Sequence, residues 1–290
     1  MWNDHQRLKE LPLSEEQAAR LLNAAVQEVR RTVVARRFIA LLGPLGAGVE
    51  SVPMVTIGKD EKAQISLEGH PDPSPIGGQD DRTYVRVPLV YKDFIIHWRD
   101  VTWSRDTGTP LDPANAVRAA HQLGHAEDKL LFEGSPELGV HGLLTWPGTL
   151  GLESSDWNAP GAPVRDVYSA IRLLLDADHH FPYALVTSVD MYEALLKKVT
   201  ESPVLELEQV SKLCEDGVFW SPQIAPGTAA VVSTGAQNFD IAVAEDLQLA
   251  YLGPADMNYR FRAYESLLLR VKRPTAVCVI SARAPRARSG

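Results

Sequence analysis

The sequence lacks the features of a membrane-spanning, secreted or disulfide-bonded protein. No run of about 18 apolar residues occurs that could cross a bilayer, and the opening residues MWNDHQRLKE have no apolar core of the kind found in a secretion signal. The two cysteines, Cys214 in a helical pattern and Cys278 in a strand-like pattern, indicate neither a disulfide framework nor a metal knuckle. We therefore expect a cytoplasmic protein in which both cysteines are small buried side chains.

Positive charge is also scarce. The 290 residues include 29 Lys and Arg against 37 Asp and Glu, which gives a formal net charge of -8. Nucleic-acid binding needs clustered cations that displace counterions, so this balance argues against it. Arg283, Arg286 and Arg288 could form a nucleic-acid arm, but the small residues around them favour a solvated tail. A hydrophobic content of 45% is typical of a globular chain with one large domain or two ordinary ones.

The motifs that mark common active sites are missing as well. The sequence contains no Gly-rich phosphate loop, nucleophile elbow or zinc-protease helix, and no thiol nucleophile stands out. Two pairs of adjacent carboxylates, Glu127-Asp128 and Glu245-Asp246, point in different directions on a helix or strand and are poorly placed for acid and base catalysis. Salt bridges or solvent exposure explain these pairs better than an active site does.

The best candidate for chemistry lies on one predicted helix. His121, His125 and Asp128, spaced i, i+4 and i+7, could share a face and offer imidazole and carboxylate ligands to a metal. Projection at about 100° per residue places them beside the apolar stripe of the helix rather than within it. Histidine pairs at this spacing are also common on wet helix faces, so a solvated or interface role is favoured over a metal site.

The first strong pattern along the chain is an amphipathic helix. Ser14 and Gln17 match a capping box, so the helix should begin near Glu15. Apolar residues then recur at steps of three and four, as on one buried helical face: Leu21, Leu22, Ala25, Val26, Val29 and Val33. We expect this helix to end before the Gly43-Pro44 turn.

A Gly- and Pro-rich stretch from Gly58 to Gln79 begins around the strand-like segment AQISL and is followed by the alternating segment TYVRVPLVY. This arrangement predicts a long two-stranded arm. An isolated hairpin is marginal in water because its edges stay unpaired and little apolar area is covered. A partner chain would supply the missing contacts; the alternative is a long loop that lies on its own domain.

Four more helices and a set of strands complete the expected order. Asp112 and Pro113 should start a long helix that ends before Gly134. Its inner stripe consists of Val117, Ala120, Leu123, Gly124, Leu130 and Leu131. Shorter helices are expected at 164–175, 188–198 and 203–217, and strands at 182–188, 228–234, 239–246, 259–272 and 275–280. Helices in the middle and strands at the end indicate a mixed α+β chain.

Several segments, in order along nearly the whole chain, resemble an encapsulin shell protein. They are RRFIALLGPLGAGV, YKDFIIHWRDV, AEDKLLFEG followed by GVHGLL, FPYALVTS, and AYLGPADMNYRFRAYESLLLRVKRPTAVCVI. Encapsulins resemble tailed-phage major capsid proteins of the Hong Kong 97 fold. The resemblance implies this α+β fold, divided into an N-terminal helix and start of the peripheral domain (1–57), an extended arm (58–92), the peripheral domain with its spine helix (93–139), the axial domain (140–225), and a return to the peripheral domain with a C-terminal tail (226–290).

The same resemblance implies a shell protein rather than an enzyme. Copies of the chain would assemble into an icosahedral cytoplasmic compartment without a cofactor, membrane or nucleic acid, and would capture cargo through its C-terminal targeting peptide. The segments YKDFIIHWRDV, VLELEQV with DGV, VVSTG and MNYRFR resemble the family 1 branch with ferritin-like cargo. Iron storage in the lumen and protection against oxidative stress are therefore expected. The alternatives are a dye-decolourising peroxidase cargo, or a prophage major capsid protein, which the charge of -8 disfavours.

Two sets of site residues follow from the resemblance. In relatives the targeting peptide docks on the inner wall beside the N-terminal helix, and the matching positions here are Val29, Val33 and Arg36. Val33→Asp is then expected to leave shells intact but empty. The segment DADHHF matches the loop that faces the five-fold axis, and its polar residues are Asp176, Asp178, His179 and His180. From the residues alone it is either an ordinary helix-to-strand turn or a cation-gathering cluster; a ring of Asp178 and His179 repeated by symmetry would favour cation entry.

Overall fold

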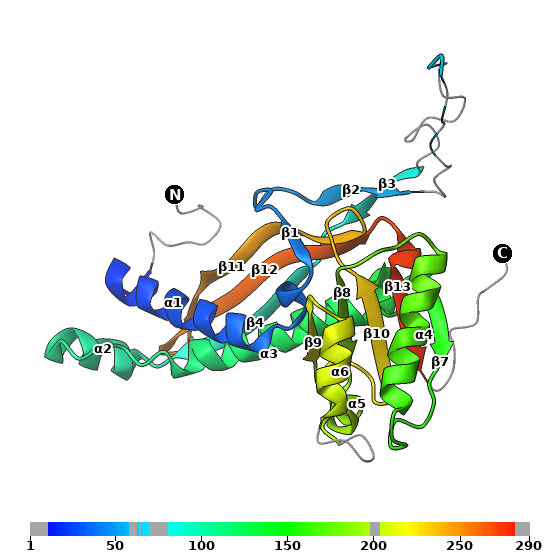
Figure 1. Ribbon diagram of the computed structural model, residues 1–290. Helices are drawn as coiled ribbons and strands as arrows, with labels where there is room; N and C mark the ends of the chain where they lie inside the picture. Colours follow the sequence, from blue (N-terminus) through cyan, green and yellow to red (C-terminus); the bar gives the residue numbers. More distant parts are fainter. Residues whose placement is uncertain are drawn as a thin grey trace.

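The computed structural model describes residues 11–57, 63, 65, 67–69, 81–197 and 204–281. Two β-sheets, each with helices packed against it, form most of the molecule (Figure 1). Within the described ranges, no helix combines the length and apolar character needed to cross a bilayer. The structure thus has a mixed α+β architecture, as the order of helical and strand-like segments predicts.

The N-terminal helix α1 spans Glu15–Thr32 and begins as predicted. The Ser14 side chain accepts a hydrogen bond from the Gln17 amide and the Gln17 side chain accepts one from the Ser14 amide, which completes the capping box. The helix ends before Gly43-Pro44, as expected, because the β-branched run that starts at Thr32 favours extended backbone. A short 3-10 helix, η3 (Ala35–Arg37), and the strand β1 (Ala40–Leu42) follow it instead.

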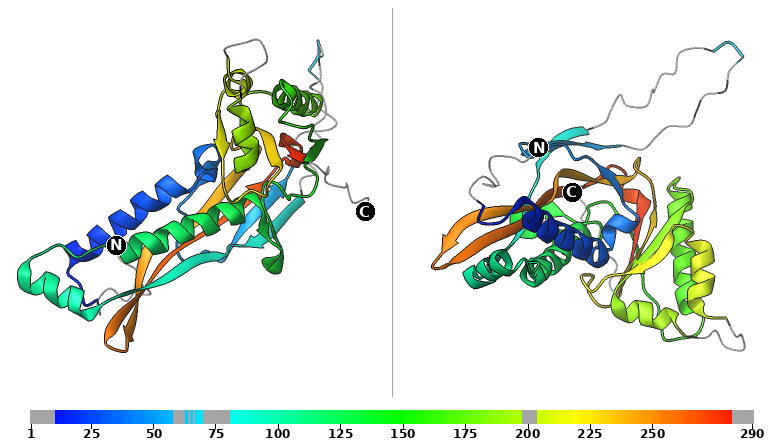
Figure 2. Two further views of the ribbon diagram at one scale, coloured as in Figure 1. Left: turned by 90° about the horizontal axis from the view of Figure 1, so that it is seen from below. Right: turned by 90° about the vertical axis from the view of Figure 1, so that its left-hand side faces the viewer.

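The first sheet has the strand order β1-β11-β12-β4. Its centre is the long antiparallel pair β11 (Phe239–Ala255) and β12 (Asn258–Val271), with β4 (Leu89–Ile96) antiparallel to β12 and β1 parallel to β11. Figure 2 shows α1 and α3 (Ala114–Phe132) running alongside this sheet. A further helix, α2 (Trp98–Thr107), connects β4 to α3 and is absent from the sequence prediction.

The long helix α3 closely matches its predicted bounds. Asp112 accepts a hydrogen bond from the Ala114 amide at 2.9 Å, and Gly134 follows the helix with a left-handed φ of 80°. At Gly124 the helix passes so close to α1 that an added Cβ would lie 3.0 Å from Thr32 Cβ. Small residues in the predicted inner stripe therefore let the two helices pack closely.

The second sheet has the order β7-β13-β10-β8-β9. It comprises β7 (Leu150–Glu153), β8 (Tyr183–Thr187), β9 (Gly217–Trp220), β10 (Thr228–Ser233) and β13 (Val277–Ser281). Beside it lie the helices α4 (Ala162–Asp176), α5 (Val189–Leu195) and α6 (Glu206–Leu213), all close to predicted segments although α5 and α6 are shorter (Figure 1). The closing segment 226–290 thus contributes to both sheets, because β10 and β13 pair with β8 and β7 rather than with β11 and β12.

Both cysteines are buried and unpaired, as predicted. Cys214 and Cys278 belong to one apolar cluster between the second sheet and its helices. Burial raises the pKa of each thiol to about 12, so neither is a thiolate at neutral pH.

A separate two-stranded ribbon pairs β2 (Ser51–Thr56) with β3 (Asp81–Arg86). The prediction that AQISL forms one strand of this ribbon is wrong: β3 pairs with β2, and the described residues Ala63, Ile65 and Leu67 are not in a strand. Residues 58–62, 64, 66 and 70–80 of the predicted arm lie outside the described residues, as do the C-terminal arginines. A smaller pair, β5 (Gly134–Ser135) and β6 (Val140–His141), flanks the 3-10 helix Pro136–Leu138 after α3, and another 3-10 helix, Pro274–Ala276, precedes β13.

Candidate functional site

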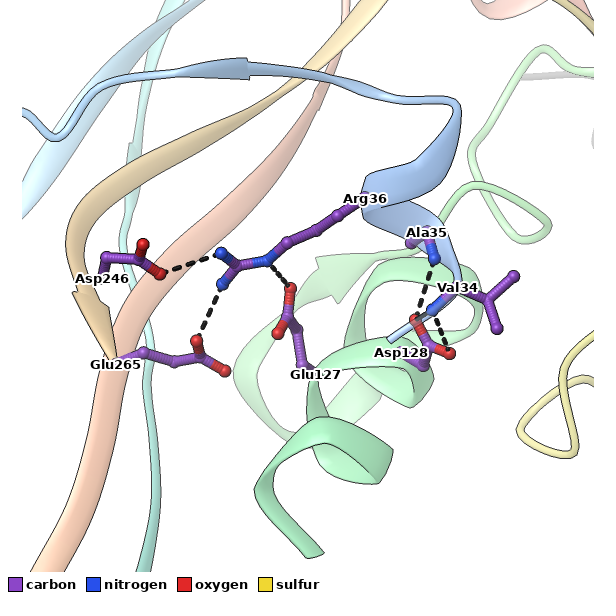
Figure 3. Close-up of polar contacts among 7 residues, drawn as sticks. All are labelled: Val34, Ala35, Arg36, Glu127, Asp128, Asp246 and Glu265. Atoms are coloured by element: carbon purple, nitrogen blue, oxygen red, sulfur yellow. Dashed lines mark hydrogen bonds and ion pairs between the residues drawn. The ribbon is translucent and has the colours of Figure 1, made fainter. Parts of the chain in front are cut away.

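Arg36 is the centre of a charged cluster where η3, α3 and the first sheet meet (Figure 3). Its Nε donates to Glu127 Oε1 at 2.5 Å, its Nη1 to Asp246 Oδ1 at 2.8 Å, and its Nη2 to Glu265 Oε2 at 2.8 Å. The side chains of Glu127 and Glu265 are fully buried, whereas that of Asp246 is 62% exposed. One guanidinium therefore ties together three segments that are far apart in the sequence.

The two buried glutamates and Arg36 shift one another's pKa. Burial raises the pKa of both Glu127 and Glu265, and the neighbouring Glu127 raises that of Glu265 further. For Arg36 itself, attraction to the two glutamates outweighs burial and raises the pKa. Among the described residues, Glu127 Oε2 and Glu265 Oε1 have no hydrogen-bond partner.

Asp128, the neighbour of Glu127, fixes the other side of the same joint. Its carboxylate accepts hydrogen bonds from the amides of Val34 and Ala35 at 3.0 Å and from Ser221 Oγ at 3.1 Å. Burial raises the pKa of this carboxyl to about 6, although the backbone hydrogen bonds oppose the shift. Adjacent carboxylates on α3 thus hold the chain after α1 from two directions, in agreement with the predicted salt-bridge role for Glu127.

The residues expected to bind a cargo peptide are occupied by the fold itself. Val29 is 5% exposed and Val33 2% exposed, and both belong to the main apolar cluster. The Arg36 guanidinium is held by the three carboxylates. Val33→Asp would place a charge in this apolar cluster, so its effect on cargo cannot be separated from an effect on folding. On α1, the apolar side chains that remain partly exposed are Leu22 and Val26.

The segment DADHHF forms the turn between α4 and β8, and its four polar residues divide into two groups. Asp176, Asp178 and His180 are exposed, and His180 Nε2 lies 3.4 Å from Asp178 Oδ1. His179 is only 2% exposed, and its Nε2 lies 2.8 Å from Thr275 Oγ1. Of the two residues predicted to form a charged ring, Asp178 is therefore exposed in the single chain and His179 is buried.

His179 instead anchors the turn as a neutral side chain. Burial, together with the positive charge of Arg273, lowers its pKa to about 4. Its backbone carbonyl accepts a hydrogen bond from the Tyr183 hydroxyl at 2.9 Å. The exposed partner of Asp178 is His180, so these two side chains are the ones that could face a pore.

The candidate metal group is assembled only in part. His121 and His125 approach each other, with their Nε2 atoms 3.0 Å apart, and Glu28 of α1 joins them through a 2.9 Å contact to His121 Nδ1. Asp128 is turned away toward η3. Within the described ranges, no group of three or more His, Cys, Asp or Glu residues gathers as metal ligands.

Large apolar side chains, which the sequence analysis did not single out, are exposed on the first sheet, the ribbon and α2. Examples are Leu41 on β1 (53% exposed), Tyr84 on β3 (70%), Tyr91 and Ile95 on β4 (52% and 42%), and Trp103 on α2 (63%). Because β1 and β4 are the two edge strands of the sheet, these side chains are available to more than one neighbour. The segment TYVRVPLVY could have indicated this surface, because its apolar residues occupy both faces of the strands.

Comparison with known proteins identifies relatives over most of the chain. Residues 3–268 match the family Linocin_M18, described as encapsulating protein for peroxidase. The chain is 39% identical over 271 residues to the type 1 encapsulin shell protein EncA of Myxococcus xanthus, which covers 93% of this chain and 94% of that protein. It is 34% identical over 273 residues to a diheme-cytochrome-encapsulin shell fusion protein of Kuenenia stuttgartiensis. This match covers 93% of this chain and 74% of the fusion protein.

Solved structures share the fold at lower identity. The virus-like particle from Pyrococcus furiosus superposes with a TM-score of 0.72 at 19% identity, covering 92% of this chain and 99% of that one. The capsid of Myoviridae Phage XM1 superposes with a TM-score of 0.60 at 14% identity, covering 84% and 90%. The predicted α+β fold of the Hong Kong 97 type is confirmed.

Proposed function

This chain belongs to the encapsulin family of shell proteins, and we propose that its copies assemble into a closed icosahedral compartment in the cytoplasm. The observation that carries the proposal is the exposed apolar surface of β1, β3, β4 and α2 on a chain with the capsid fold. A two-stranded ribbon is marginally stable alone, and copies packed against it would cover Tyr84 and its neighbours. In this role the chain contributes contacts and a barrier, not catalysis.

We assign the first sheet with α1, α2 and α3 to the peripheral domain and the second sheet with α4, α5 and α6 to the axial domain. Two observations support this division into domains: the chain forms two separate sheets, and the second sheet shares its own apolar cluster with its helices. The ribbon forms the base of the extended arm. On this assignment β10 and β13, within 226–290, belong to the axial domain rather than to the peripheral one.

The enclosed cargo in this proposal is a ferritin-like protein that oxidises iron and carries a C-terminal targeting peptide. This cargo is supported by the segments YKDFIIHWRDV, VLELEQV with DGV, VVSTG and MNYRFR, which resemble the iron-storing branch. The lumen would then hold iron as stored product, and the shell would limit oxidative damage. The description of the family as an encapsulating protein for peroxidase favours the alternative, a peroxidase cargo.

The targeting peptide would dock beside α1, on side chains the fold leaves accessible. Leu22 and Val26 are one helical turn apart and partly exposed, which suits an apolar peptide side chain. Small cations would enter past the α4–β8 turn, where Asp176, Asp178 and His180 are exposed. Carboxylates repeated around a symmetry axis attract cations as charged rings in channels do.

Electron microscopy of the chain expressed alone, paired with size-exclusion chromatography, tests the shell proposal. Closed particles of uniform size are expected, whereas a stable small oligomer would contradict the proposal. Mass spectrometry of particles isolated from the native cell tests the cargo. A ferritin-like protein supports iron storage, and a haem peroxidase would replace it without affecting the shell assignment.

A further inference from the structure

Two histidines, one turn apart on α3, direct their outer nitrogens toward each other. His121 Nε2 and His125 Nε2 are 3.0 Å apart, and the ring planes are inclined at 82°. The ring centroids are only 4.5 Å apart, closer than a straight end-to-end N–H···N contact between two imidazoles would place them. The two rings are therefore bent away from a straight end-to-end contact.

The other nitrogen of each ring is held by a side chain from a different element. His121 Nδ1 donates to Glu28 Oε1 of α1 at 2.9 Å, and His125 Nδ1 accepts from the Gln223 amide at 2.7 Å. The remaining proton then lies on His125 Nε2, which donates to His121 Nε2. In metal sites a ligating histidine is usually oriented by such a partner on its second nitrogen. Both rings have this support in the folded chain.

The distance between the Nε2 atoms indicates which metals fit. With metal–nitrogen bonds of about 2.0–2.1 Å, a separation of 3.0 Å corresponds to a nitrogen–metal–nitrogen angle of about 91–97°. Adjacent positions in a square-planar or tetragonal complex have this angle, and Cu(II) and Ni(II) prefer such complexes. A tetrahedral Zn(II) site would require the rings to move apart.

The pair is also accessible. The His121 side chain is 45% exposed and lies at an open groove of about 840 Å³, whose lining includes Glu28, Asp93, Arg118 and Gln122.

We propose that His121 and His125 form an open Cu²⁺ or Ni²⁺ site, with one ion per copy of the chain. The two Nε2 atoms are the protein ligands, and water from the groove fills the other positions. Binding displaces the proton from His125 Nε2, and Nδ1 takes up a proton from solvent, so the ring stays neutral while its second nitrogen becomes the N–H. When Nδ1 carries this proton, Gln223 turns its amide so that the oxygen accepts. The site goes beyond the proposed shell function, and its failure would leave that function intact.

The test uses assembled, untagged full-length shells dialysed free of metal and titrated with CuSO₄ or NiCl₂. Calorimetry should give one tight site per chain, and electron paramagnetic resonance of the copper form should show two equatorial nitrogens. His121→Gln and His125→Gln should each weaken binding at least tenfold. Glu28→Gln should weaken it about tenfold, because loss of an orienting partner reduces metal affinity by about 10–100-fold.

His141→Ala, which removes an exposed histidine elsewhere, is the matched control and should keep the site. Microscopy of each variant establishes that shells are present, so a loss of binding is not a loss of assembly. The proposal is overturned if the wild-type shells bind no copper or nickel. It is also overturned if the glutamine variants bind as tightly as wild type, because the ion would then lie elsewhere.

Discussion

At the residue level, Arg36 is the side chain whose removal should affect the fold most. Arg36→Met leaves Glu127 and Glu265 buried without a cation, and breaking a buried ion pair in this way costs about 3–5 kcal/mol. The free energy of unfolding, measured by urea denaturation with tryptophan fluorescence, should fall by this amount. Arg262→Met, which breaks a more exposed pair with Asp93, should cost about 1 kcal/mol or less.

A triple variant separates the charge effect from the loss of packing. Arg36→Met combined with Glu127→Gln and Glu265→Gln contains no buried charge at this position, so it should recover part of the lost stability. If the triple variant is as unstable as Arg36→Met, the cluster contributes through shape rather than through charge.

His179 should make the stability depend on pH between about 6.5 and 4. Its pKa is about 4 in the folded chain and about 6.5 when unfolded, so on acidification the unfolded state takes up the proton first. The stability that depends on the neutral ring is complete above pH 6.5 and is lost as the pH falls to 4, at up to about 1.4 kcal/mol per pH unit. His179→Gln, which can still bond to Thr275, should flatten this slope in urea titrations. His180→Gln, at the exposed neighbour, should not.

Cargo loading should separate the partly exposed face of α1 from its buried face. Val26→Asp places a charge on the accessible side, so shells should form but contain less cargo, as judged by densitometry of purified particles. Val33→Asp buries an unpaired charge and should lower the free energy of unfolding by more than about 3 kcal/mol. Few shells should then form. Full loading of Val26→Asp shells would contradict docking at this position.

Most of these side-chain roles could not be predicted from the sequence, because the partners lie far apart along the chain. Glu127 and Glu265 lie 91 and 229 positions from Arg36, and spacing along one helix contains no information about another strand. The histidine pair was found because i and i+4 lie within one helix, whereas its orienting partner Gln223 lies 98 positions from His125.

At the level of elements, the contact between α1 and α3 depends on Gly124. A Cβ at this position would lie 3.0 Å from Thr32 Cβ and 3.4 Å from Val33 Cγ2, so Gly124→Val should destabilise the fold by about 1–3 kcal/mol through overpacking. Ala126→Val, on the exposed side of the same helix, is the control and should cost less than about 1 kcal/mol. Equal losses in urea denaturation would mean that helix propensity, not packing, limits this position.

Helices with clear caps were predicted well, and elements defined by distant pairing were not. The capping box of α1 and the Asp112 cap of α3 are local, and both were located correctly. The end of α1 was predicted only as lying before Gly43-Pro44, because the apolar period continues through Val33 while the backbone already turns there. The ribbon was assigned the wrong partner, AQISL, because strand-like composition does not specify pairing: Ser51–Thr56 pairs with β3 instead.

At the level of the whole molecule, the fold leaves apolar side chains that no intrachain contact covers. The two faces of the β2–β3 ribbon differ: Val52 and Met54 are buried, whereas Tyr84 on the opposite face is 70% exposed. A monomer gains nothing from this exposure. A closed shell repeats the same contact at every copy. A small favourable free energy per contact therefore adds up to a strong preference for assembly.

Tyr84→Glu should therefore prevent assembly while leaving the chain folded. The side chain is exposed in the isolated chain, so a carboxylate there is hydrated and has little effect on circular dichroism. In a contact with a neighbouring copy the carboxylate would lose its hydration, at a cost of several kcal/mol per contact, and this cost recurs at every copy. Size-exclusion chromatography and electron microscopy should show small oligomers for Tyr84→Glu and normal particles for Tyr84→Phe, which keeps the ring. Normal particles from Tyr84→Glu would place the assembly contacts elsewhere, with the exposed Trp103 of α2 as the next position to test.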